Sequence, residues 1–213
     1  MFKEEFKIKE YLDTHDISKL QLGCGAFPID GWLNTDCDIR LTKNGIVYLD
    51  VTKPFNLPDS SFDYVYSEHL FEHLNYKEEI NMLKECYRIL KPGGIIRIST
   101  PNIEFLIDLY LHPDKEINKA YIEFDSKRIR QPNNPVYAIN HFHTDWGHKI
   151  IHSPESLSNL LTEIGFKNIC QCEVGKSTHE PLNNIEQHEE HFNRMGCKYD
   201  FNCLQTMILE AEK

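Results

Sequence analysis

Short apolar runs alternate with helical patterns along most of this chain, and each run ends at a polar residue or a glycine. Runs of this length are typical of buried strands, and strands that alternate with helices pair in parallel. The pattern therefore predicts an α/β fold with a mostly parallel sheet. The predicted strands span residues 19–22, 32–35, 46–49, 62–66, 94–99, 166–174 and 204–211.

Three helices are marked by periodicity and by their ends. Residues 1–15 carry apolar side chains among charges, as in an amphipathic helix, and residues 80–90 repeat apolar positions at helical spacing before Pro92. Ser153 offers an N-cap for a third helix, which would end at Gly165. At 213 residues, without repeats or an evident linker, we expect a single domain over 1–213.

The connection between the first two predicted strands is unusually short. Only residues 24–31 separate them, whereas a parallel crossover needs a dozen residues or more. The helix that normally fills such a crossover is therefore expected to be shortened or absent.

Composition excludes several functions. The net charge is −10 and the only basic cluster is Lys127, Arg128 and Arg130, so we expect no nucleic-acid partner. No run of 18 apolar residues predicts a membrane span, and the charged start is unlike a signal peptide, which favours a cytoplasmic location. The seven cysteines indicate reduced thiols, with Cys170 and Cys172 expected to be buried on one strand. The sequence does not indicate an oligomeric state.

Glycines and acids follow three successive strands. Gly23 and Gly25 follow the first strand, Asp36 ends the second and Asp50 the third. In an open parallel sheet, ligands bind at the carboxyl ends of the strands, where glycine lets the backbone approach closely. Asp36 could accept hydrogen bonds from a ribose diol and Asp50 one from an adenine amine. A plain tight turn and turn-forming aspartates are the alternatives.

Five segments form a pattern in order and spacing. They are LGCG (22–25), GWLNTD (31–36), LPDSSFD (57–63), SEHLFEHL (67–74) and LKPGG (90–94). Together they resemble the type-11-like class I methyltransferases, which depend on S-adenosyl-L-methionine. The resemblance is strong over roughly residues 18–101 and weaker from His148 to the C-terminus. It implies a Rossmann-like methyltransferase fold, with a mostly parallel seven-stranded sheet and one antiparallel C-terminal strand.

The resemblance assigns roles at the cofactor site residue by residue. The turn Gly23, Cys24 and Gly25 would approach the methionine part and Asp36 would hold the ribose. Asp50 and the backbone of Val51 would frame the adenine, and Ser67, Glu68 and His69 would line the sulfonium side.

The chain also departs from this family's pattern. Gln21 and Phe27 replace a usual acid and a usual glycine. The short first connection resembles a subgroup often found with carbohydrate-modifying genes, so the small-molecule acceptor is expected to be a sugar or nucleotide-sugar hydroxyl.

The segment His69-Leu70-Phe71-Glu72-His73 also matches the His-x-x-Glu-His pattern of zinc peptidases. On a helix, the two histidines would lie on one face and share a metal, with Glu72 as the base. The segment follows a predicted parallel strand inside the methyltransferase resemblance. We therefore expect no metal site, and a zinc peptidase is only the alternative.

Residues 102–152 interrupt the alternation of strands and helices, and we expect them to form an acceptor-binding lid. Their histidine-rich end suits an acceptor-site base, structural histidines or a metal site. His143 or His148 is the candidate base, because its ordinary pKa of ~6.5 lies near cellular pH, with Asp145 as the orienting partner. A catalytically idle cofactor-binding protein is the other alternative. A dehydrogenase is disfavoured because the region lacks a full Gly-x-Gly-x-x-Gly.

Overall fold

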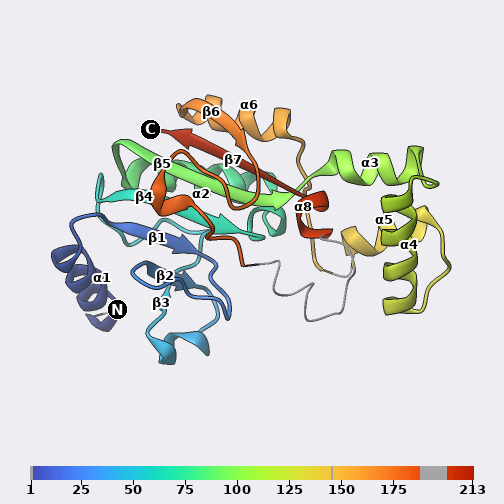
Figure 1. The fold of residues 1–213 in the computed structure, drawn as a ribbon. Coiled ribbons are helices and arrows are strands. Elements are labelled where there is room, and N and C mark those ends of the chain that lie inside the picture. Colours follow the sequence, from blue (N-terminus) through green and yellow to red (C-terminus); the bar gives the residue numbers. More distant parts are fainter. Residues whose placement is uncertain (1, 145, 188–200) are drawn as a thin grey trace.

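A seven-stranded sheet forms the centre of the computed structural model, which describes residues 2–144, 146–187 and 201–213. The strand order is β3-β2-β1-β4-β5-β7-β6 (Figure 1). β7 runs antiparallel to both of its neighbours, and the other pairs are parallel. This confirms the predicted fold class. The strands are β1 (Lys19–Leu22), β2 (Leu33–Asp36), β3 (Val47–Tyr48), β4 (Phe62–Glu68), β5 (Leu90–Pro101), β6 (Lys167–Cys172) and β7 (Thr206–Glu212).

β5 is longer than the sequence pattern predicted, because the Pro-Gly-Gly segment lies inside it. Phe62 pairs with Leu90, and the register then shifts so that Tyr64 pairs with Ile95. A proline and glycines are tolerated at such an irregularity, where the ladder is interrupted. A Cβ atom on Gly94 would lie 2.9 Å from the Lys91 carbonyl oxygen, so this bulge leaves no room for a side chain.

No helix separates β1 from β2, as expected from the short connection. The Gln21 side chain holds this loop at two points: its amide nitrogen donates to the Phe27 carbonyl (3.2 Å) and its oxygen accepts from the Ile29 backbone N–H (3.1 Å). A carboxylate could only accept. The glutamine at this unusual position therefore has a structural reason, since it bonds both a donor and an acceptor of the loop.

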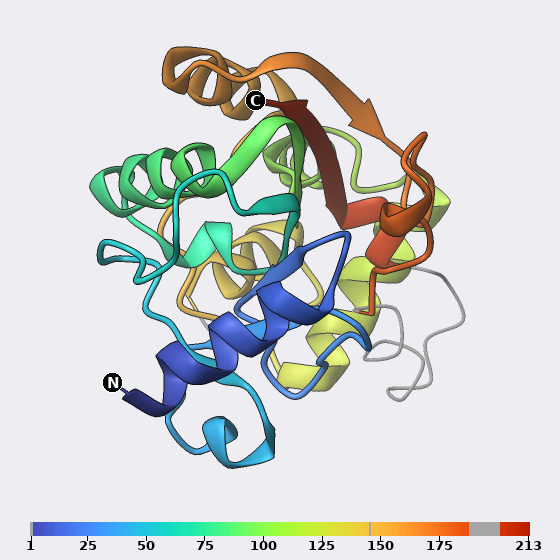
Figure 2. The ribbon, with the colours of Figure 1, turned by 90° about the vertical axis from the view of Figure 1, so that its left-hand side faces the viewer.

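Helices α2 (Tyr76–Ile89) and α6 (Pro154–Ile164) pack together against the sheet, and their apolar side chains join its main core. Helix α1 (Phe2–Thr14) lies at the opposite end of the sheet from α3–α5, in the foreground of Figure 2. A separate apolar cluster contains Trp32, Tyr66 and Ile95. Leu182 and Ile185, from the segment after β6, pack on these three residues. This segment includes the short helix η3 (Glu180–Leu182).

Residues 102–152 fold mainly as three helices beyond the carboxyl end of β5 (Figure 1). They are α3 (Ile103–Leu111), α4 (Glu116–Ile129) and α5 (Pro135–Thr144). A later short helix, α8 (Phe201–Gln205), packs with them. The four share an apolar cluster that is distinct from the sheet core. The two ends of the segment meet in a parallel bridge between Asn102 and His152. We call α3, α4 and α5 the helical unit.

The predicted burial of the Cys170 and Cys172 pair is wrong. Cys170 is exposed and Cys172 half-buried, because β6 is the outer strand of the sheet. Among the described residues, no helix is long and apolar enough to cross a membrane.

A fully buried arginine ties β5 to β7 and to the segment after β6. The Nε atom of Arg97 donates to Glu186 (2.7 Å), and its Nη1 atom donates to Glu210 (2.5 Å). Burial lowers the pKa of Arg97, but the two carboxylates more than offset this and raise it. Arg97 therefore stays charged inside the protein.

Replacing one partner should strongly destabilise the fold. Glu210→Ala leaves part of the Arg97 charge uncompensated, and we expect it to lower the free energy of unfolding by about 3–5 kcal/mol, measured by urea denaturation. The exposed pair of Glu123 with Lys127 (2.6 Å) is the control, and Glu123→Ala should cost far less than Glu210→Ala, because solvent screens this pair. Equal losses of unfolding free energy in both variants would show that the buried ion pair contributes no more to stability than the exposed one.

Candidate active site

The turn after β1 brings backbone to the carboxyl edge of the sheet. Gly23 and Gly25 have φ values of 63° and 54°, which disfavour larger residues. A Cβ atom on Gly23 would lie 3.0 Å from a methyl carbon of Leu70, whereas one on Gly25 meets nothing within 4 Å. Gly25 thus combines left-handed backbone with open space. Between them Cys24 is buried, and this burial raises the pKa of its thiol to about 12.

Asp36, at the end of β2, holds this turn. One of its carboxylate oxygens accepts from the Gly25 N–H (2.8 Å) and the other from the Asp38 N–H (2.7 Å). A carboxylate oxygen can accept more than one hydrogen bond, so these contacts leave acceptor capacity. The structure therefore brings Gly23, Gly25 and Asp36 together, as the sequence predicted.

Asp50 lies near Asp36 along the sheet edge, since the Leu49 N–H donates to the Asp36 carbonyl (3.0 Å). Its carboxylate accepts from the backbone N–H and the hydroxyl of Thr52, at 3.0 and 2.6 Å, and pairs with Lys53. The Thr52 hydroxyl is the main cause that lowers the pKa of Asp50. The contacts observed are those of a turn-forming aspartate, the alternative considered from the sequence.

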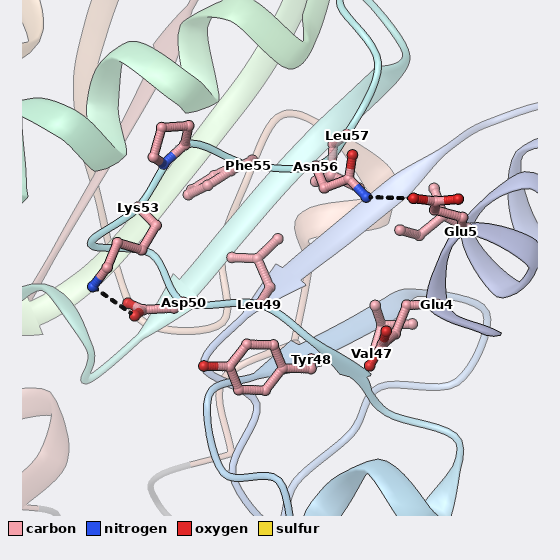
Figure 3. Close-up of a pocket in the computed structure, with 12 residues that line it drawn as sticks. Glu4, Glu5, Val47, Tyr48, Leu49, Asp50, Lys53, Phe55, Asn56 and Leu57 are labelled. Carbon is pink, nitrogen blue, oxygen red and sulfur yellow. Dashed lines mark hydrogen bonds and ion pairs between the residues drawn. The ribbon is translucent and has the colours of Figure 1, made fainter. Parts of the chain in front are cut away.

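A cavity of about 490 Å³ extends from Asp50 along β3 towards α1 (Figure 3). Its wall is mainly apolar and includes Val47, Leu49 and Phe55, with Glu4 and Glu5 contributed by α1. The cavity reaches the predicted adenine end of the site only at Asp50.

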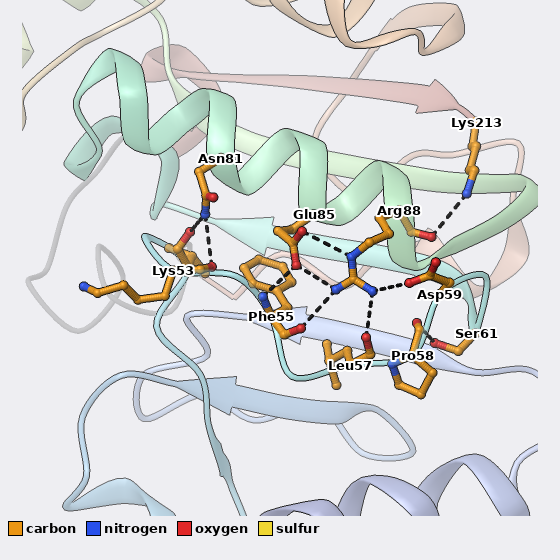
Figure 4. A network of polar contacts seen from close by, with 11 residues as sticks. Lys53, Phe55, Leu57, Pro58, Asp59, Ser61, Asn81, Glu85, Arg88 and Lys213 are labelled. Atoms are coloured by element: carbon orange, nitrogen blue, oxygen red, sulfur yellow. Dashed lines mark hydrogen bonds and ion pairs between the residues drawn. The ribbon is translucent and has the colours of Figure 1, made fainter.

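The segment after Asp50 is fixed by α2 (Figure 4). Arg88 donates to the carbonyls of Phe55 (3.0 Å) and Leu57 (2.8 Å), and Glu85 accepts from the Phe55 N–H (2.6 Å). The Asn81 amide donates to the carbonyl of Val51 (3.1 Å). This hydrogen bond occupies the backbone carbonyl of Val51, and the buried side chain of Val51 belongs to the core.

The end of β4 lies beside the glycine turn, because Ser67 is paired with Leu22. Ser67 is buried, and its hydroxyl has no hydrogen-bond partner in the described part of the chain. Glu68 accepts from the Gln187 N–H at 3.0 and 3.1 Å. The His69 N–H donates to the Ser99 carbonyl (2.9 Å), and the left-handed φ of 48° at His69 turns the chain off the strand.

The helical arrangement on which the zinc-peptidase alternative depends is not observed. Only the short 3-10 helix η2 (Phe71–His73) forms, and His69 precedes it. The His69 Nδ1 atom lies 3.1 Å from a Glu72 oxygen and its Nε2 atom 3.3 Å from the Thr206 hydroxyl. His69 and His73 therefore do not form the shared helical face that the peptidase pattern requires.

His73 instead lies beside His148. Their ring centroids are 5.0 Å apart, and one ligand atom from each of Glu72, His73 and His148 lies within 4.8 Å of the others. The carbonyl of Glu72 accepts from the Lys149 N–H (2.8 Å), which brings the returning segment of the chain to η2. We call Glu72, His73 and His148 the three-residue cluster.

Burial and neighbouring groups perturb this cluster. Burial, opposed by the nearby Glu72 charge, lowers the pKa of His148 to about 4. Burial would raise the pKa of Glu72, but the hydrogen bond and charge of His69 outweigh it and hold that pKa below its usual value. At neutral pH, Glu72 is a carboxylate and His148 is neutral.

The remaining histidines of the segment divide into different roles. His141 is buried against Asp125 (2.8 Å), and His152 bonds Glu79 (3.0 Å) inside the protein, so both are structural. His143 is half-buried on α5. Asp145 lies outside the described residues.

Sequence reasoning missed the joint placement of His148 with Glu72 and His73. The two parts lie 75 residues apart along the chain (148 − 73 = 75), and no local pattern links them. The only available signal was that both segments, residues 69–73 and 141–152, are rich in histidine.

Comparison with known proteins finds similarity to methyltransferases over part of the chain. Residues 33–98 match the model of a methyltransferase domain family. A probable S-adenosylmethionine-dependent methyltransferase of Mycolicibacterium smegmatis is 44% identical over 46 residues, which span 22% of this chain and only 17% of that relative.

Solved structures extend the likeness to the whole fold. A methyltransferase from Archaeoglobus fulgidus has a TM-score of 0.53 at 19% identity, covering 99% of this chain and 94% of its own. One from Mesorhizobium loti has a TM-score of 0.53 at 16% identity, covering 99% and 97%. At such identities the likeness establishes the fold.

The fold is that of the class I, Rossmann-like methyltransferases. Within it, residues 33–98 are similar to a methyltransferase domain family. The predictions of family, enzyme class and cofactor agree with these similarities.

Gly25 offers a direct test of the cofactor site. Gly25→Ala adds a methyl group in open space at a positive φ, so we expect a stability loss of ~1–2 kcal/mol and much weaker binding of S-adenosylmethionine in calorimetry. Gly45→Ala is the matched control, because Gly45 also has a positive φ and no atom near its Cβ. It should lose stability but keep cofactor affinity. Unchanged affinity in Gly25→Ala would separate this turn from the cofactor.

Asp36→Ala should weaken cofactor binding by ~1–3 kcal/mol, about 5- to 150-fold, because it removes charged hydrogen-bond acceptors. Calorimetry on folded protein measures this. Asp38→Ala is the control within the same turn, since the Asp38 carboxylate bonds the exposed Arg40 and should leave affinity intact. An affinity loss of equal size in both variants would mean that Asp36 acts only through the loop.

Proposed function

We propose that this chain transfers a methyl group from S-adenosylmethionine to a hydroxyl group of a small-molecule acceptor, with sugars and nucleotide sugars as the first class to test. The observation that carries the proposal is the hydrogen bond between Asp36 and the Gly25 backbone at the carboxyl edge of the sheet. It joins a glycine turn to an acid on the neighbouring strand, as a ribose- and methionine-binding edge requires.

The helical unit supplies the acceptor side in this proposal. It follows β5 directly, and its return segment is bonded to η2 through the Lys149 N–H and the Glu72 carbonyl (2.8 Å). It therefore lies next to the sheet edge and has its own apolar cluster. Trp146 is exposed beside Arg128, whose guanidinium carbon lies 5.2 Å from the ring centroid. We take the unit as a lid over the acceptor.

The reaction is an in-line displacement at the methyl carbon. The acceptor oxygen forms a bond to carbon while the carbon–sulfur bond breaks, and S-adenosylhomocysteine leaves with the electron pair. The protein must position the two reactants, exclude water and remove the hydroxyl proton. We take His143 as the base, because its half-buried ring lies on the helical unit. Asp145 remains the proposed orienting partner.

The net charge of −10 and the shortness of the one basic cluster in the sequence favour a small acceptor over a polynucleotide. Reduced cysteines are in keeping with action in the cytoplasm. An idle cofactor-binding protein would bind the same cofactor but give no methylated product. Incubation with a methyl-labelled donor and a panel of sugars, nucleotide sugars and other small metabolites tests the proposal, and no labelled product from any acceptor would contradict it.

His143→Ala should lower methyl transfer by about 100- to 10,000-fold, the usual contribution of a general base. Cofactor affinity should stay almost unchanged, because His143 lies on the helical unit and the cofactor residues lie on the sheet edge. Steady-state rates with the identified acceptor and calorimetry with the cofactor measure the two quantities. A loss of under about tenfold in folded protein would assign His143 a structural role, and a collapse of cofactor affinity would place it in the cofactor site.

A further inference from the structure

We infer that Glu72, His73 and His148 form a binding site for a divalent cation of the first transition-metal row. The site lies on the acceptor side of the proposed active site, next to the proposed methyl-donor site. From the sequence we expected no metal site, because the His-x-x-Glu-His segment follows a predicted parallel strand inside the methyltransferase resemblance. The metal alternative considered there was a helical pair of His69 and His73. The fold breaks this pair and gives His73 a different partner.

The three-residue cluster has the spacing of a ligand set. One ligand atom of each residue lies within 4.8 Å of the other two, and the residues come from two distant parts of the chain. The backbone holds these parts together, since Lys149 and Ile150 both donate to the carbonyl of Glu72, at 2.8 and 3.3 Å. The convergence is therefore built into the fold and does not depend on long exposed side chains.

Each ligand is oriented by a contact behind it. The His73 Nδ1 atom lies 3.4 Å from the Gly147 carbonyl, which can only accept, so Nδ1 carries the proton and Nε2 has a free electron pair. Metal-binding histidines commonly donate their second ring N–H to a backbone carbonyl in this way. Glu72 is 1% exposed and accepts from the Thr100 hydroxyl (3.0 Å), which fixes its carboxylate.

His148 completes the set. Its Nδ1 atom is buried and makes no well-formed hydrogen bond within the described residues, although the ring interacts with the Phe142 backbone. A buried ring nitrogen without a partner is costly unless something binds it. The rings of His73 and Phe142 hold His148, with centroids 5.0 and 5.2 Å away.

Ligand chemistry selects the type of cation. Two imidazoles and one carboxylate favour zinc, manganese, iron or cobalt over magnesium and calcium, which prefer oxygen ligands. Three protein ligands leave coordination positions open, as in catalytic sites.

The position of the cluster indicates what the open positions would hold. η2 begins against the glycine turn, where Leu70 lies under Gly23, and the proposed lid returns through His148. Resting on the proposed function, the cation would bind the acceptor hydroxyl and ease loss of its proton to His143 or solvent. The alkoxide then attacks the methyl carbon while the carbon–sulfur bond breaks. Acceptors with two neighbouring hydroxyls would bind best, because they chelate the ion.

Metal binding is measured first, without cofactor or acceptor. The purified chain is stripped with a chelator, dialysed and titrated with Zn²⁺ or Mn²⁺ alone by calorimetry, and with Co²⁺ by visible absorption. We expect one ion per chain, and we expect His73→Ala and His148→Ala each to weaken binding by at least about 100-fold, since even partners behind a ligand contribute 10- to 100-fold. Thr100→Val, which removes only the bond behind Glu72, should cost about tenfold.

His112→Ala is the matched control, because His112 is exposed, bonds Asp108 and lies outside the cluster. It should bind the ion as the unmodified chain does. Circular dichroism checks that each variant is folded. The inference is overturned if the unmodified chain does not bind the ion, or if His73→Ala and His148→Ala bind it as tightly as the unmodified chain does. Either result leaves the methyl-transfer proposal untouched. Binding of the ion without any methylated product would instead contradict the proposed function alone.

Discussion

Glu72 is the residue on which the proposed active site depends most. Its carboxylate is buried between His69 and Thr100, at the ends of β4 and β5, and its carbonyl accepts backbone N–H groups from the end of the segment 102–152. One residue therefore links two sheet strands to a helical unit that is built on a separate apolar cluster. A buried carboxylate is stable only with such partners, so the geometry around Glu72 is held tightly.

The glycine turn shows how a short connection can replace a helix. A crossover helix would normally place its N-terminal N–H groups near a bound ligand. Here the Asp36 carboxylate and the Gln21 amide fix the loop instead, through the backbone of Gly25, Phe27 and Ile29. Without a crossover helix, the carboxyl edge of the sheet is open at Gly25, where an added Cβ atom would meet no other atom within 4 Å.

Much of this arrangement could be predicted from the sequence, because local patterns carry it. The order and approximate positions of the strands, the capped helix after Ser153 and the missing first helix follow from residue spacing and turn chemistry. The Gly25–Asp36 contact follows from parallel strands that end at one edge. The misplaced start of β5 shows the limit of such patterns, since pairing with β4 carries that strand through Pro92 and two glycines.

The three-residue cluster could not be predicted, because it depends on long-range backbone pairing. The helical period would have placed His69 and His73 on one face, but the positive φ at His69 and the 3-10 turn separate them. His148 then reaches His73 only because the segment after α5 returns beside η2. Periodicity describes neighbours along one element, whereas a site made at the meeting of two elements is fixed by tertiary contacts.

This division between the sheet edge and the proposed lid has a chemical consequence. The groups proposed for the methyl donor lie in the turns after β1 and β2. Those proposed for the acceptor lie on η2, on the helical unit and on the segment that follows α5. The acceptor side can therefore change without disturbing the donor side. A cation held by Glu72, at the boundary between the two, would fix the acceptor oxygen relative to the methyl carbon. The proton could then leave to a base on the lid, so that positioning and deprotonation are supplied by different elements of the fold.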